Sequence, residues 1–263
     1  AISNNFETNK NHLVPISGGV DSRVILAGLL EHTSAEKINT YTFGTKNTYD
    51  YEIGNKIAKI LGTKHTSFDL KDNDYSFEEL VRTSKAFRNQ TLLFYHPNLS
   101  KIEKYFKGNQ YWSGFLGDPI AGSHFINNNS KNNQDAIELF IKKNIFVNSI
   151  NLSSEKNDIH LSKLIKTPLN KYNLSIYEQL DLFNRQLKYI YPHVLFEGFD
   201  YKTPFTNKEW VNFMLSVDNV KYRENCSLYY KIVLNAYPDL FKVPVKNKLG
   251  SRLNSKISYT FKR

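Results

Sequence analysis

Cysteine is nearly missing from this chain, which has one, Cys226, among 263 residues. A single thiol excludes an internal disulfide framework and any metal cluster built on thiolates. We therefore interpret Cys226 as an ordinary, semi-buried thiol on a helix. With alanine at residue 1, we also expect Cys226 not to serve as an N-terminal nucleophile.

Long hydrophobic runs are missing as well. No stretch of about 18 apolar residues occurs, and residues 1–12 contain no apolar signal core. We therefore expect a soluble, cytoplasmic protein without a membrane partner. Hydrophobic residues at 40% and charged residues at 23% are ordinary globular values, so the length predicts one large domain or two small ones.

Acidic residues are outnumbered, with 25 Asp and Glu against 35 Lys and Arg and a formal net charge of +10. This excess favours anionic partners such as a nucleotide, pyrophosphate, an acidic sugar or peptide, or RNA. The lysines are spread along the whole chain, however, and such a distribution is typical of solvated surface. We therefore predict no nucleic-acid site.

The clearest chemical signal is the sequence LVPISGGVDS at residues 13–22. A short apolar run predicts a buried strand with Pro15 at its end, and the run 24–30 predicts a helix. Between them, Gly18 and Gly19 let the backbone approach a ligand closely. Their N–H groups would face it at the positive end of the helix dipole. This arrangement predicts an anion site, most simply for phosphate.

Ser17 and Ser22 add hydroxyl donors to this loop, whereas Asp21 would repel a bare phosphate. Asp21 fits best as a ligand of a divalent metal that bridges phosphates. The loop lacks the Lys-Ser/Thr pair of a Walker A loop and the G-x-G-x-x-G spacing of the dinucleotide fold. SGGVDS instead resembles the PP-loop of the N-type ATP pyrophosphatases, which split ATP between the α- and β-phosphates.

Strands that alternate with helices predict an α/β fold with a parallel sheet flanked by helices and a mainly helical C-terminal half. The expected strands are 38–44, 65–70 and 111–113, and the expected helices are 50–61, 76–88, 135–145, 175–191, 208–216 and 227–236. A surface loop is expected at 125–133. We divide the chain into an ATP-binding core at 1–126 and a mainly helical part at 127–263 that completes the substrate pocket. Ligands of such sheets gather beyond the carboxyl ends of the strands.

Five stretches together, in order, resemble the synthetase domain of asparagine synthetases and their relatives, which include β-lactam synthetases and lasso-peptide cyclases. They are SGGVDS at 17–22, YTFG at 41–44 with DYEI at 50–53 and LGTKH at 61–65, SGFLGD at 113–118, DYKTPF at 200–205, and KNKLG at 246–250. The resemblance implies roles for individual residues. Ser17, Gly18, Gly19 and Ser22 would hold the phosphates of ATP, the backbone at Pro15, Phe43 and Gly114 would frame the adenosine, and Asp21 and Asp118 would coordinate Mg²⁺.

The same resemblance implies that Lys248 stabilises charge during the reaction, and that Asp200 keeps a catalytic carboxylate. The implied reaction is amide formation: a substrate carboxylate is adenylated, pyrophosphate leaves, and the acyl group passes to ammonia or an amine. The carboxylate would belong to a small molecule, a peptide or a sugar. The matching stretches include no glutamine-hydrolysing segment, so the nitrogen would come from a separate glutaminase domain or subunit, or from solution.

Two departures from the family pattern leave alternatives open. Phe115 stands where asparagine synthetases have Glu and β-lactam synthetases have Tyr, so help from a general base is lost there. Pro119 replaces the acidic residue that follows the loop aspartate. The alternatives are a nucleotide-binding pseudoenzyme and an authentic asparagine synthetase subunit without its glutaminase domain. A tRNA-modifying enzyme is a further alternative, although the cysteines of sulfur transfer are lacking.

Overall fold

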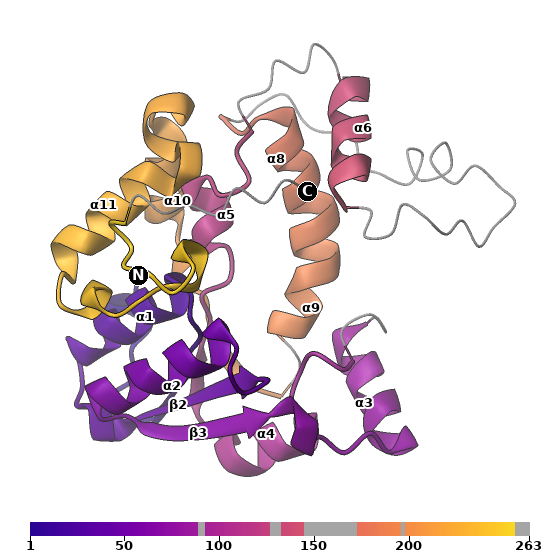
Figure 1. The fold of residues 1–263 in the computed structure, drawn as a ribbon, viewed down its shortest axis with the longest axis vertical. Helices are drawn as coiled ribbons and strands as arrows, with labels where there is room; N and C mark the ends of the chain where they lie inside the picture. Colours follow the sequence, from indigo (N-terminus) through magenta and orange to yellow (C-terminus); the bar gives the residue numbers. More distant parts are fainter. Residues whose placement is uncertain (89–92, 127–132, 145–172, 196–197, 256–263) are drawn as a thin grey trace, which may run out of the picture.

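The structure is a computed structural model that describes residues 1–88, 93–126, 133–144, 173–195 and 198–255. A five-stranded, fully parallel sheet with the strand order β3-β2-β1-β4-β5 forms its base (Figure 1). The strands are β1 (His12–Pro15), β2 (Ile38–Gly44), β3 (Lys64–Asp69), β4 (Gln110–Trp112) and β5 (Asp200–Lys202). The predicted parallel sheet with flanking helices is thereby confirmed.

Helices cover both faces of the sheet. Successive residues of a strand point to opposite faces, so each strand can pack against both layers of helices. Leu13 packs in a cluster with α3 (Phe77–Phe87) and α4 (Leu99–Phe106). Its neighbour Val14 packs in a second cluster with α1 (Asp21–Leu30), α2 (Tyr49–Leu61) and α11 (Ser227–Ala236). Both side chains are fully buried, as expected for a parallel strand that is covered on two sides.

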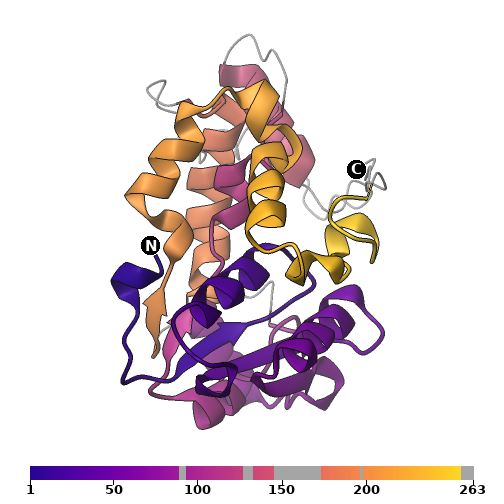
Figure 2. The same ribbon diagram turned by 90° about the vertical axis from the view of Figure 1, so that its left-hand side faces the viewer.

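The second half of the chain is mainly helical, and Figure 2 shows its helices stacked over the sheet layer. Its described helices are α6 (Asn133–Asn144), α8 (Ile176–Leu180), a π-helical stretch (Asp181–Ile190), α9 (Tyr191–Val194), α10 (Lys208–Ser216) and α11. Strand β5 also comes from this half and pairs with β4. The division at 126/127 stays a prediction, because residues 127–132, which include most of the expected surface loop, lie outside the described residues.

Side-chain caps mark the starts of three of the described helices, α3, α8 and α10. Ser175 and Glu178 form the full reciprocal capping box at the start of α8, and Asn207 caps α10 through two backbone N–H groups. At α3, only one hydrogen bond of the expected capping box forms: the Ser76 hydroxyl accepts from the Glu79 N–H. The Glu79 carboxylate accepts from the backbone N–H of Ser100 and not from that of Ser76.

Some details differ from the expectations. Helices α4 and α5 (Gly117–Ala121) and strand β5 had not been predicted as elements. Cys226 is buried rather than semi-buried, and it precedes α11 instead of lying within it. Within the ranges that the structure describes, no helix has the length and apolar character needed to cross a membrane.

Candidate functional site

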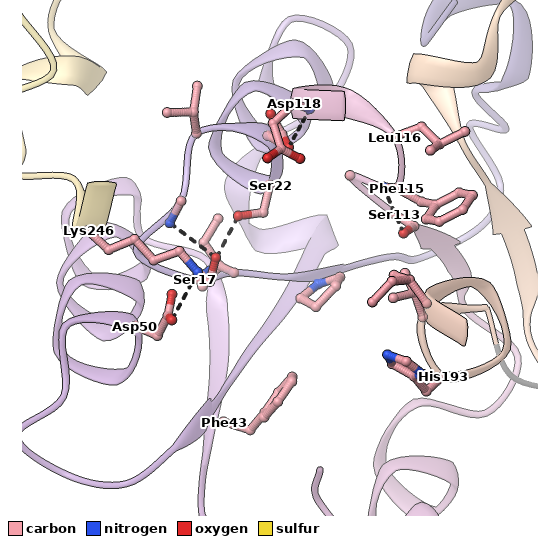
Figure 3. A pocket seen from close by; sticks show the side chains of 18 of the residues that line it. Ser17, Ser22, Phe43, Asp50, Ser113, Phe115, Leu116, Asp118, His193 and Lys246 are labelled. Atoms are coloured by element: carbon pink, nitrogen blue, oxygen red, sulfur yellow. Dashed lines mark hydrogen bonds and ion pairs between the residues drawn. The ribbon is translucent and has the colours of Figure 1, made fainter. Parts of the chain in front are cut away.

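A cavity of about 500 Å³ opens at the carboxyl ends of β1, β2 and β4. Pro15 and Ile16 line it where β1 ends, Phe43 lines it from β2, and Ser113 and Gly114 line it where β4 ends. The edge at which parallel strands end is the usual ligand edge of an open α/β sheet. The cavity therefore lies where the sequence predicted a site (Figure 3).

The loop between β1 and α1 carries the predicted phosphate-binding residues. The Ser17 hydroxyl accepts a hydrogen bond from the Gly19 N–H at 3.2 Å, and the Ser22 hydroxyl accepts one from the Ser17 N–H at 3.3 Å. Ser17, Gly19 and Ser22 line the cavity. Gly18 is packed closely beside it, because a Cβ there would lie 3.0 Å from the Tyr49 carbonyl oxygen. The loop is thus held by its own hydroxyls at the amino end of α1.

Asp50 and Lys246 form an ion pair across this loop. Asp50 accepts a hydrogen bond from the Gly18 N–H at 3.1 Å. It accepts a second one from Lys246 Nζ at 3.0 Å (Figure 3). An anion bound at the loop would use the same two donors. Both side chains are almost half-exposed, so their pairing contributes little to stability and Lys246 can turn to a phosphate.

Buried Arg23 of α1 fixes the chain segment that carries Lys246. Its guanidinium donates to the carbonyl oxygens of Val243 at 2.9 Å and Pro244 at 2.8 Å. The backbone N–H of Lys246 then donates to the Gly18 carbonyl oxygen at 2.9 Å. Lys248, which the sequence favoured, ends the same short 3-10 turn but is not among the residues that line the cavity.

Asp21 and Asp118 meet at the start of α1. The Asp118 N–H donates to one Asp21 carboxylate oxygen at 3.1 Å, and the Tyr229 hydroxyl donates to the other at 2.8 Å. Both carboxylates line the cavity. Burial, and after it the nearby charge of Asp118, raise the pKa of Asp21 to about 8. Two neighbouring acidic groups that are both partly shielded from water are best stabilised by a cation.

Glycines allow this meeting. A Cβ on Gly117, at the start of α5 (Gly117–Ala121), would lie 2.5 Å from Asp21 Cγ. A Cβ on Gly114 would lie 2.9 Å from Asp21 Cβ. The two glycines of Ser-Gly-Phe-Leu-Gly therefore let the loop after β4 approach α1 closely.

The donor set fits Mg²⁺ bound together with phosphates. Asp21 and Asp118 supply hard oxygen ligands, and Mg²⁺ is commonly bound by one or two carboxylates with substrate phosphates completing its shell. Among the described residues, no group of three or more His, Cys, Asp or Glu side chains could hold a metal by itself. The site is thus suited to a metal that arrives with a nucleotide.

Residues 3–93 match the family model described as asparagine synthase. Over this range, the chain is asparagine synthetase-like. The matched range includes the loop at 17–22, Phe43 and Asp50, so the resemblance inferred from the motifs is confirmed there. No curated protein matches the chain.

The asparagine synthetase-like range ends before Asp118 and Lys246, and the fold brings both of these residues to it. The structure does not bring Asp200 to the same place. Asp200 is the first residue of β5, pairs in register with Gln110, and does not line the cavity, which opens where the strands end. Its carboxylate forms ion pairs with Lys10 at 2.9 Å and Lys202 at 3.1 Å instead.

Many residues that line the cavity had no signal in the sequence. They include Tyr41, Phe87, Tyr95, His96, Tyr111, Gln186, Ile190, His193 and Val194. Burial lowers the pKa of both His96 and His193 to about 4, so both imidazoles are neutral at pH 7. Gln186, Ile190, His193 and Val194 come from one helix, 181–194, and the others come from separate segments. They share no motif, so only the fold identifies them as a group.

Proposed function

We propose that this protein is an ATP-dependent amide-forming ligase that activates a carboxylate by adenylation. The observation that carries this proposal is the contact between Asp21 and Asp118 beside the glycine loop. A carboxylate pair next to backbone N–H groups at a helix start suits a nucleotide triphosphate with its metal. The asparagine synthase match over residues 3–93 supports the same class of reaction.

Each part of the site has a role in this proposal. Ser17, Gly18, Gly19 and Ser22 bind the phosphates, with the positive end of the α1 dipole behind them. Pro15, Phe43 and Gly114, which line the cavity, frame the adenosine. Asp21 and Asp118 would hold Mg²⁺, which when bound neutralises phosphate charge.

The first step joins a substrate carboxylate oxygen to the α-phosphorus and breaks the bond from the α-phosphorus to the bridging oxygen, and pyrophosphate leaves with the electron pair. A cation near the loop stabilises the charge on the leaving group. Lys246 stands beside the loop in the structure, and Lys248 remains the candidate from sequence. In the second step, an amine nitrogen bonds to the acyl carbon, AMP leaves, and the amine proton passes to solvent.

Ammonia or an amine is the second substrate in this proposal, supplied from solution or by a separate glutaminase domain or subunit. The Phe115 ring packs against the Tyr191 ring with 5.8 Å between centroids, and it can accept no proton. The amine must therefore react in its neutral form. We expect turnover to rise with pH as the free amine fraction increases.

The test uses ATP labelled at the α-phosphate, Mg²⁺, a panel of carboxylic acids and hydroxylamine, which traps acyl-adenylates as hydroxamates. We expect AMP and hydroxamate to form in equal amounts, and only when an accepted acid is present. Formation of ADP, or AMP that does not depend on any acid, would contradict the proposal.

The second candidate is a nucleotide-binding protein without turnover, which Phe115 in place of an acid or a tyrosine favours. It predicts that ATP binds with Mg²⁺ in calorimetry while no acid and amine pair yields AMP. Asparagine formation from aspartate, ammonium and ATP would instead identify an authentic asparagine synthetase subunit.

A further inference from the structure

One side of the cavity is formed by a single helical face. Gln186, Ile190, His193 and Val194, all from the continuous helix 181–194, line the cavity, and Phe115 lines it from the loop after β4. Figure 3 shows Phe115 and His193 on the side of the cavity opposite Lys246 and Asp50. We call these five lining residues the acceptor wall.

The acceptor wall is uncharged. Among the lining residues in the described part of the chain, the ionised types are Asp21, Asp50, Asp118 and Lys246, all at the phosphate loop or the start of α1. Two cations of the helix 181–194, Arg185 and Lys188, do not line the cavity. Arg185 lies 3.8 Å from Asp181, and Lys188 donates to Asn184 at 3.1 Å.

This charge distribution disfavours an amino acid as the activated acid. Free aspartate brings a second carboxylate and an ammonium group, and each would need a partner when water is excluded. Lys246 is the one lining cation that the described residues provide, and the phosphates compete for it. An acid with an uncharged body needs no such partners and gains from contact with the acceptor wall.

Gln186 adds one directional polar contact to this wall. Asp181 accepts hydrogen bonds from Gln186 Nε2 at 2.9 Å and from His124 Nδ1 at 2.5 Å. Because an ionised carboxylate can only accept, the amide nitrogen of Gln186 must face Asp181, and the amide oxygen must face away from it. Within the described residues no donor contacts this oxygen, so it can accept a hydrogen bond from a ligand in the cavity.

From these observations, we infer that the acid activated here is a monocarboxylic acid with an uncharged aryl or branched alkyl body, bound against the acceptor wall. A hydroxyl or amide donor on that body pairs with the oxygen of Gln186. This inference rests on the proposed function, whose site it extends by naming the substrate class.

The first test measures acid-dependent AMP formation with phenylacetate, 4-hydroxyphenylacetate, 3-methylbutanoate, aspartate and glutamate. We expect kcat/KM to be at least 100-fold higher for the three acids whose only charge is the carboxylate than for the two amino acids. A preference for aspartate or glutamate would overturn the inference while leaving the proposed function standing. If no carboxylic acid supports AMP formation, in this panel or in a wider one, both the inference and the proposed function are wrong.

Substitutions in the helix 181–194 test whether the acid binds against the acceptor wall. Ile190→Arg places a cation on the acceptor wall, whereas Leu187→Arg adds the same charge to the same helix at a residue that does not line the cavity and is 42% exposed. We expect Ile190→Arg to lower kcat/KM for phenylacetate at least tenfold with less than a twofold change in KM for ATP. Leu187→Arg should change neither value.

Two further variants keep the test decisive if Ile190→Arg does not fold. Ile190→Ala should raise KM for phenylacetate, and Gln186→Leu should remove the advantage of 4-hydroxyphenylacetate over phenylacetate. If Ile190→Ala instead weakens binding of an ATP analogue as much as it weakens the acid, the acceptor wall binds the nucleobase and the inference is wrong.

Discussion

The backbone N–H of Asp118 donates to the carboxylate of Asp21 at 3.1 Å, although 97 residues separate them in the chain. The contact is possible because β1 and β4 are neighbours in the parallel sheet, so the loops that follow them meet at one edge. It joins the start of α1 to the start of α5. The proposed metal site depends on this contact.

The raised pKa of Asp21 predicts how stability varies with pH. An unfolded Asp ionises near pH 4, whereas burial and Asp118 raise the pKa of folded Asp21 to about 8. The folded protein therefore binds one more proton between these values, and the free energy of unfolding should fall by at most about 1.4 kcal/mol per pH unit as pH rises from 4 to 8. Urea unfolding at several pH values in EDTA measures this slope.

Asp21→Asn should flatten that slope over pH 5 to 8. Asp200→Asn is the control, because ion pairs with Lys10 and Lys202 hold the pKa of Asp200 below its usual value and leave it ionised throughout this range. Adding Mg²⁺ with an ATP analogue should stabilise the wild type more at pH 8 than at pH 6. A slope that is unchanged in Asp21→Asn would show that another group causes it.

Gly117→Ala tests the close approach of the two loops. The new Cβ would lie 2.5 Å from Asp21 Cγ, so the carboxylate must shift. We expect a loss of roughly 1–3 kcal/mol in stability and at least a tenfold loss in affinity for Mg²⁺ with an ATP analogue. Urea unfolding and calorimetry measure the two effects.

Gly62→Ala is the matched control for that variant. Gly62 has a left-handed φ of 73°, and a Cβ added there would meet nothing within 4 Å, so alanine costs roughly 1–2 kcal/mol through the backbone alone. It lies at the end of α2 and should leave nucleotide affinity unchanged. Equal affinities for Gly117→Ala and the wild type would contradict the role assigned to the loop.

The sequence predicted the elements that local chemistry determines. Pro15 was expected at a strand end and ends β1, and β2 has the predicted bounds. Strand β5 was missed because Asp200 and Lys202 flank a single tyrosine and leave no apolar run. Its place at the sheet edge depends on pairing with β4, whose residues lie 90 positions earlier in the chain than their partners in β5.

The candidate site was predictable only in part. The loop at 17–22 has a motif because backbone geometry and anion binding constrain adjacent residues. Whether Lys246 or Lys248 lies at the cavity depends on Arg23, which holds the segment before Lys246. Its hydrogen bonds to the carbonyl oxygens of Val243 and Pro244 join residues 220 and 221 positions apart in the sequence. Such long-range contacts leave no local pattern, and the resemblance of the KNKLG stretch to the family segment implied Lys248 instead.

Lys246→Met and Lys248→Met compare the two lysines. Because Lys246 lines the cavity and pairs with Asp50 beside Gly18, its loss should lower acid-dependent AMP formation by about 100-fold, a typical contribution of one charge-stabilising group. From the geometry, Lys248→Met should have a smaller effect. The reverse order would restore Lys248 as the lysine that stabilises the reaction.

The most direct test of the account is a calorimetric titration of the wild type and Asp118→Asn with α,β-methylene-ATP, in Mg²⁺ and again in EDTA. If Asp21 and Asp118 hold the metal on the phosphates, Asp118→Asn should bind at least tenfold more weakly in Mg²⁺, and the two proteins should bind alike in EDTA. Equal affinities in Mg²⁺ would contradict the account.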